Sequence, residues 1–141
     1  MRRRDFLVLC AGAATLATTG CATMADDQRK SLRDARVERG SGVIVVYAAF
    51  YDQVWSALPA VMKELELRVA SDNKAEGSLL AETGAAAFSR GERIAVFIER
   101  VGTSGGIRVE VVSGRSAGAN ASVDDWAPKI HEKLGKRFKR V

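Results

Sequence analysis

The pattern of hydrophobic and polar residues predicts a folded domain that begins near Gly42. The run Val43–Ala48 is apolar and rich in β-branched residues, which is typical of a strand. Beyond this strand, apolar residues recur at helical spacing and predict an amphipathic helix, which Asp52 would cap and Pro59 would kink. Its apolar face consists of Val54, Trp55, Leu58, Val61, Met62 and Leu65.

The second half of the chain predicts four more strands and a final helix. Alternating residues indicate strands at 67–71, 78–83, 93–99 and 107–111, and turn residues lie between them. In the last of these strands, Arg108 and Glu110 are expected to face water. Asp124 or Asp125 is expected to cap the final helix. The residues expected to pack against the sheet are Trp126, Ile130, Leu134 and Phe138.

These elements predict the α+β class. Their order is strand, helix, four strands and helix (β-α-β-β-β-β-α). This order favours a five-stranded, mainly antiparallel sheet with two helices on one face. Residues 42–141 are enough for one domain and not for two.

The N-terminal residues predict export from the cytoplasm. Three arginines precede a short apolar run, and small residues follow it up to Cys21, which is the order of a bacterial lipoprotein signal. The residues Arg3, Arg4, Phe6 and Leu7 are similar to the twin-arginine export signature. We therefore expect a signal peptide over residues 1–20, lipidation with palmitate at Cys21, and a polar tether over residues 21–41 with almost nothing to bury.

Alternatives remain open for this segment. The arginines also fit an ordinary Sec signal, and signal cleavage after Ala22 or Ala25 would give a soluble periplasmic protein. If Cys21 carries lipid, Ala22 stands where enterobacterial inner-membrane retention requires Asp, which favours the outer membrane.

The composition excludes some functional classes. The formal net charge of +5 falls to +3 when residues 1–20 are removed, because these contain three arginines and one aspartate. Such a mild charge in an envelope protein does not predict nucleic-acid binding. Cys10 would leave with the signal and Cys21 would carry lipid, so no thiol remains for a disulfide or metal. We expect no metal and no cofactor.

The strand and helix pattern resembles small uncharacterised bacterial envelope lipoproteins. The resemblance covers roughly residues 43–138 and is carried by YDQVWSAL at 51–58, LELRV at 65–69 and EGSLLA at 76–81. The same pattern is similar to the helix-grip repeats of the BamC lipoprotein of the β-barrel assembly machinery. The resemblance implies a helix-grip-like fold and an envelope location, and it implies no catalytic residue.

Few residues suggest chemistry. His131 is the single histidine, stands among charged residues, and is expected to be a solvated helix residue and not a metal ligand. Trp55 and Trp126 continue apolar helix faces, so core packing is favoured over ligand stacking. A basic cluster in the C-terminal helix is a candidate patch for an anionic lipid head group or cell-wall polymer. The patch consists of Lys133, Lys136, Arg137, Lys139 and Arg140.

The sequence thus favours a non-enzymatic outer-membrane lipoprotein whose periplasmic domain binds an envelope protein. Binding of an anionic envelope ligand through the basic C-terminal residues is the alternative.

Overall fold

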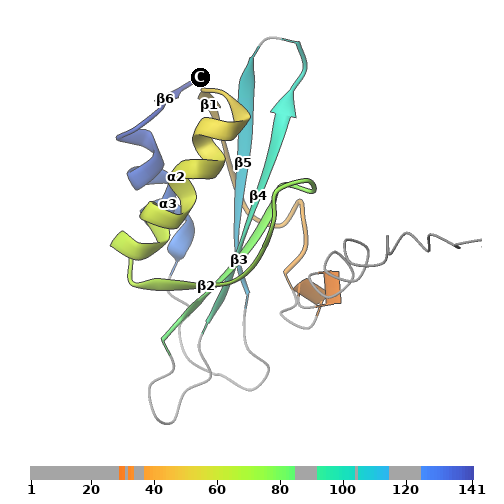
Figure 1. Ribbon diagram of the computed structural model, residues 1–141, viewed down its shortest axis with the longest axis vertical. Coiled ribbons are helices and arrows are strands. Elements are labelled where there is room, and N and C mark those ends of the chain that lie inside the picture. The colour runs from red at the N-terminus through yellow and green to blue at the C-terminus, as the bar shows by residue number, and fades with distance from the viewer. Residues whose placement is uncertain (1–28, 31, 34–36, 85–91, 104, 115–124) are drawn as a thin grey trace, which may run out of the picture.

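The protein was analysed as a computed structural model, which describes residues 29–30, 32–33, 37–84, 92–103, 105–114 and 125–141. These residues form an antiparallel sheet with two helices on the same side of it (Figure 1). The α+β class and the antiparallel sheet predicted from the sequence are confirmed.

The sheet has six strands in the order β2-β3-β4-β5-β1-β6. Each neighbouring pair is antiparallel. The elements are β1 (Val43–Ala48), α2 (Tyr51–Glu64), β2 (Leu67–Asn73), β3 (Ser78–Thr83), β4 (Arg93–Val101), β5 (Gly106–Gly114), α3 (Trp126–Gly135) and β6 (Lys139–Arg140).

The prediction of five strands is wrong because the C-terminal residues form a sixth. The final helix α3 ends at Gly135 instead of continuing to the C-terminus, so Phe138 lies beyond it. Arg140 then pairs with Tyr47, and Lys139 pairs with Ala48. A strand of two residues leaves no periodicity in the sequence, and the basic residues around it suggested a helix end.

The start of α2 also differs from the prediction. Phe50 is the N-cap, and the side chain of Gln53 accepts a hydrogen bond from the Phe50 N–H at 3.0 Å. Asp52 therefore lies inside the first turn, where its negative charge suits the helix dipole. The helix continues past Pro59, which has no N–H to give to the carbonyl of Trp55.

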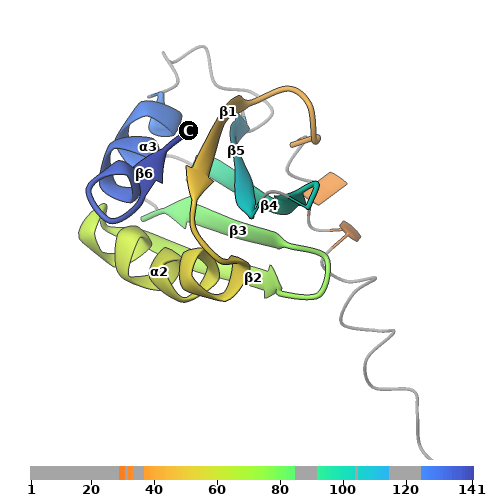
Figure 2. The ribbon, with the colours of Figure 1, turned by 90° about the horizontal axis from the view of Figure 1, so that it is seen from above.

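The main core lies between the helices and one face of the sheet. Predicted helix residues such as Val54, Leu58 and Ile130 are fully buried there. Trp55 and Trp126 are partly buried against the same core, in agreement with the packing role predicted for them. Figure 2 shows α2 and α3 together on this side.

The other face of the sheet, which we call the helix-free face, carries a second apolar cluster. Leu80, Ala95, Phe97 and Val112 line it, and Val37 packs on them with only 3% of its surface exposed. The prediction that almost nothing before Gly42 is buried is therefore wrong at Val37. A single valine among charged residues gave no periodic signal in the sequence.

Glu110 departs most from the sequence pattern. It was predicted to face water, yet it is fully buried on the helix-free face. Its Oε1 accepts hydrogen bonds from the N–H groups of Gly40 at 2.6 Å and Gly42 at 3.0 Å. The alternation placed Glu110 on the correct face, but the segment before β1 covers that face.

Candidate functional site

The described residues form an open groove of about 620 Å³. It lies where the start of α2, the turn between β2 and β3, and the outer part of β4 come together, and Arg39 forms part of its wall. Its lining residues are Arg39, Tyr51, Asp52, Lys74, Ala75, Glu76, Gly77, Ile98, Glu99 and Arg100. We call this hollow the groove.

Tyr51 is the central aromatic residue of the groove. Its hydroxyl donates a hydrogen bond to the carbonyl of Lys74 at 2.5 Å. The guanidinium of Arg100 lies 4.4 Å from the centre of its ring, and the ring of Trp55 stacks parallel to it at 6.3 Å. Burial raises the pKa of Tyr51, while the nearby Arg100 charge opposes that rise, so the phenol stays protonated at neutral pH.

Gly77 allows the turn between β2 and β3 to rest directly on β4. Its carbonyl accepts a hydrogen bond from the N–H of Ile98 at 2.7 Å. A Cβ at this position would lie 2.1 Å from the carbonyl oxygen of Ile98 and 3.0 Å from the hydroxyl of Tyr51. The φ of +64° also favours glycine. This contact forms the base of the groove.

Charges of both signs surround the groove. Lys74 forms an ion pair with Asp52 at 2.6 Å, and its hydrogen bond lowers the pKa of that carboxyl. Arg39 donates to the carbonyl of Glu76 at 2.6 Å and lies 3.6 Å from the carboxylate of Glu99. The rim therefore carries cations next to carboxylates and has no single sign of charge.

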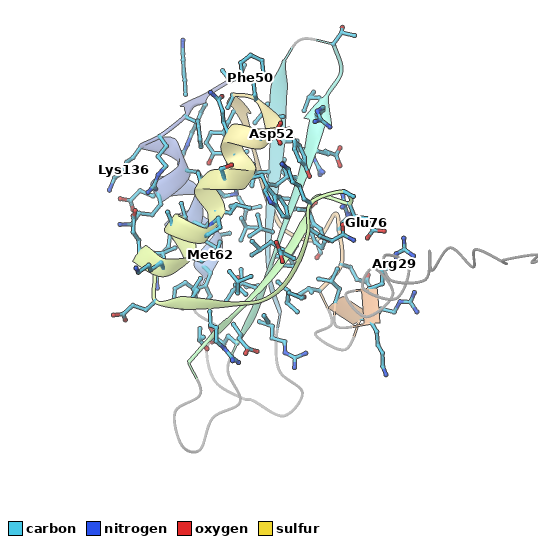
Figure 3. The ribbon with its side chains drawn as sticks, viewed as in Figure 1. Arg29, Phe50, Asp52, Met62, Glu76 and Lys136 are labelled. Atoms are coloured by element: carbon cyan, nitrogen blue, oxygen red, sulfur yellow. The ribbon has the colours of Figure 1, made fainter. Side chains whose placement is uncertain are left out.

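Arg29 reaches the same region from the predicted tether. Its guanidinium pairs with the carboxylate of Glu76. Figure 3 shows the two residues close together on the side of the molecule opposite Lys136. The segment that would follow the anchor thus contacts the domain beside the groove.

A second polar cluster involves His131, which was predicted to be solvated. The structure buries it, with 3% of its surface exposed. Its Nδ1 lies 2.9 Å from the hydroxyl of Tyr47, and its Nε2 lies 3.0 Å from the carbonyl of Val43. Arg140 donates to the His131 carbonyl at 2.9 Å. The helix periodicity missed this role because the partners of the ring, Tyr47 and Val43, lie on β1, 84 and 88 positions away in the sequence.

The predicted basic patch is divided between α3, the segment after it and β6. Lys133 and Arg137 both pair with Glu64, at 3.2 Å and 2.5 Å, and their hydrogen bonds lower the pKa of that carboxyl. Lys136 pairs with Glu132 at 2.8 Å. Two carboxylates therefore offset part of the cluster's charge, and a role in anionic-ligand binding stays a prediction.

The predicted export and anchoring residues lie outside the described residues. These are Arg3, Arg4, Phe6, Leu7 and Cys21. At the predicted N-cap of the final helix, the side chain of Asp125 accepts a hydrogen bond from the N–H of Ala127 at 3.2 Å. Asp125 is therefore the cap, out of the two aspartates that the sequence proposed.

Comparison with known proteins gives no relative: the chain matches no protein-family model and no curated protein sequence. Within the described ranges, no three histidine, cysteine or carboxylate side chains gather as a metal site would require. The helices of the same ranges are too short or too polar to span a bilayer.

Sequence reasoning did not identify the groove. Its residues come from four separate segments, and they meet because the β2–β3 turn folds onto β4. The one available signal was Gly77, one of the turn residues between the predicted strands 67–71 and 78–83, and it does not show what the turn would contact.

Proposed function

We propose that this chain is a bacterial outer-membrane lipoprotein. In this proposal Cys21 carries the acyl chains, and the periplasmic domain binds a protein partner in envelope assembly or maintenance without catalysing a reaction. The proposal includes the helix-grip-like relationship to envelope lipoproteins inferred from residues 43–138.

The observation that carries the binding role is the pair of Tyr51 and Arg100 in the groove. Tyrosine and arginine are the residue types most often found at the energetic centre of protein interfaces. Among the described residues, no carboxylate forms an ion pair with Arg100 within 4 Å, so its guanidinium is available to a carboxylate of a binding protein.

The mixed charge of the rim favours a protein partner over a uniformly anionic polymer. Asp52, Glu76 and Glu99 would repel such a polymer, whereas a protein surface can place cations opposite them. The basic C-terminal residues give less support to an anionic ligand, since three of them already form ion pairs with Glu64 or Glu132.

The anchor is tested by the intact mass of the protein extracted from membranes, beside a Cys21→Ala variant. A mass equal to residues 21–141 plus a diacyl- or triacylglyceryl group supports the anchor. An unlipidated mass that begins after residue 21 would overturn it and favour a soluble periplasmic protein.

The binding role is tested by photocrosslinking in intact envelopes. A photoreactive amino acid replaces Lys74 at the groove, and the matched control replaces Lys136 on the other side of the molecule (Figure 3). We expect a reproducible crosslinked protein only from position 74. We also expect Arg100→Ala to weaken its capture about tenfold or more. Crosslinks that are absent, or equal from both positions, would overturn the binding role.

A further inference from the structure

The segment before β1 lies across the helix-free face of the sheet. We call its described residues, 29–30, 32–33 and 37–42, the strap. Figures 1 and 2 show its described parts on the side opposite the two helices. The strap connects the predicted lipid anchor to the domain.

Four kinds of contact hold the strap, and the first two involve the apolar cluster. Val37 is buried on Leu80, Ala95, Phe97 and Val112. The guanidinium of Arg39 lies 4.7 Å from the ring centre of Phe97. The first contact removes apolar surface from water, and the second places a cation over an aromatic face.

Glu110 adds a polar contact of a different type. One oxygen of its buried carboxylate accepts the N–H groups of Gly40 and Gly42. Gly40 has a φ of +88°, and a Cβ on Gly42 would lie 2.3 Å from the carbonyl oxygen of Val111. Gly42 thus lets the backbone approach the sheet closely, and Gly40 lets it adopt the left-handed turn, so that both N–H groups meet the carboxylate.

The remaining contacts are exposed and weak individually. Arg29 with Glu76, and Arg39 with Glu99, are ion pairs whose side chains are about one third to one half exposed. Exposed pairs of this kind add little stability and are screened by salt. Against these contacts stands the conformational entropy of ordering the strap. The contacts of the strap and this entropy cost oppose each other, and such opposing terms suit reversible docking.

We propose that the strap docks reversibly on the helix-free face and so sets the distance between the membrane anchor and the groove. This inference rests on the proposed lipidation of Cys21. When the strap is docked from Arg29, eight Cα–Cα steps connect it to Cys21. When it is released, 21 Cα–Cα steps separate Cys21 from Gly42. The maximum reach rises from about 28 Å to about 73 Å.

Docking also completes the groove, because Arg39 belongs both to the strap and to the groove wall. A partner that contacts Arg39 in the groove therefore binds the docked state more tightly than the released one. By linkage, that partner shifts the strap towards docking and draws the domain to the membrane.

The test uses the full-length lipidated protein in vesicles of phosphatidylethanolamine and phosphatidylglycerol. A fluorophore is attached at a Lys63→Cys substitution on the exposed side of α2, and an acceptor lipid is placed in the bilayer. Energy transfer reports the distance from domain to membrane. Val37→Asp places a charge in the buried valine site, and Val141→Asp is the matched control at a valine that is 84% exposed.

We expect Val37→Asp to lower the transfer efficiency at least twofold, and Val141→Asp to leave it unchanged. Trypsin cleavage after Arg39 should accelerate at least tenfold in Val37→Asp alone. Equal energy transfer and equal trypsin cleavage in wild type and Val37→Asp would overturn the proposal that the strap docks reversibly. Circular dichroism of each variant checks that the domain stays folded.

The two proposals fail in distinguishable ways. If the intact mass shows no acyl group and the protein does not attach to vesicles, the anchor and the distance function are both overturned. Strap docking itself is then decided by the trypsin comparison, which does not require a membrane. If the protein is acylated but the energy transfer is the same in wild type and Val37→Asp, the anchor is supported and the distance function is overturned.

Discussion

The hydroxyl of Tyr47 lies 2.9 Å from Nδ1 of His131, although the two residues are 84 positions apart in the sequence. The same hydroxyl lies 3.2 Å from the His131 carbonyl, and Nε2 of the ring faces the carbonyl of Val43. The Val43 contact requires a proton on Nε2, so Nδ1 is the acceptor for Tyr47. This pair connects α3 to β1 inside the core.

Removing the Tyr47 hydroxyl should destabilise the domain. Tyr47→Phe leaves the buried Nδ1 of His131 without its donor, which costs about 1–3 kcal/mol in the free energy of unfolding. Tyr51→Phe is the matched control, because its acceptor belongs to the exposed residue Lys74, where water can replace the hydroxyl. Urea unfolding measures the free energy of unfolding of both variants. A loss for Tyr47→Phe no larger than that for Tyr51→Phe would contradict the proposed contribution of the pair.

The stability of the domain should depend on pH through His131. Burial lowers the pKa of His131 below its ordinary 6.5, the hydrogen bond to Val43 opposes this, and the Arg140 charge lowers the pKa further. The folded state therefore resists protonation, whereas the unfolded state takes up a proton as the pH falls below 6.5. The free energy of unfolding should decrease from pH 7.5 to 5.5, by at most about 1.4 kcal/mol for each pH unit below 6.5.

The ion-paired carboxylates of Asp52, Glu64 and Glu132 do not interfere in that window. Hydrogen bonds from basic side chains lower the pKa values of Asp52, Glu64 and Glu132 below their ordinary 3.8–4.5. Protonation of these groups therefore destabilises the domain only at lower pH. His131→Gln keeps a donor and an acceptor but does not titrate. Its unfolding free energy, followed by urea titration at each pH, should be flat from pH 7.5 to 5.5. An equal slope in wild type and variant would exclude His131 as the cause.

Glu110 should stabilise the domain by accepting hydrogen bonds. Glu110→Leu keeps a side chain of similar size but leaves the N–H groups of Gly40 and Gly42 without an acceptor, at a cost of about 2–3 kcal/mol. Glu110→Gln retains one oxygen that can accept both groups, so its loss should be about 1 kcal/mol or less. Urea unfolding compares the two variants. Similar losses of unfolding free energy in Glu110→Leu and Glu110→Gln would show that the hydrogen-bond acceptor is not the source of the stabilisation.

The sequence pattern predicted the parts of the fold that repeat. Alternation identified β2 to β5, and helical spacing identified α2 and α3 within a few residues, because each of these elements buries a regular face. The pattern failed where a single contact decides the structure. Val37, Glu110 and His131 are buried by partners distant in the sequence, and nothing in their immediate surroundings signals those partners.

The groove was beyond prediction for a related reason. Tyr51, Gly77 and Arg100 have ordinary local roles, as a helix start, a turn and a strand residue. They form a site only because the β2–β3 turn contacts β4 at one register. The register depends on the packing of the whole sheet, and no single segment of the sequence determines it.

Gly77 should be required both for the fold and for the groove. Gly77→Ala combines a left-handed φ with a Cβ that would lie 2.1 Å from the Ile98 carbonyl oxygen. We expect a loss of about 3 kcal/mol or more in unfolding free energy, because backbone strain and steric overlap add. Gly102→Ala is the matched control: its φ of +52° is also left-handed, but no atom lies within 4 Å of the added Cβ.

Gly102→Ala should therefore lose only the strain of about 1–2 kcal/mol. The difference between the two variants, measured by urea unfolding, isolates the contact between the turn and β4. Where Gly77→Ala remains folded, the turn must move away from Ile98, which displaces Lys74 and Tyr51 from their hydrogen bond. Crosslinking from position 74 should then decrease while Gly102→Ala retains it. Equal unfolding free energies for the two variants would show that the turn does not rest on β4 as the structure places it.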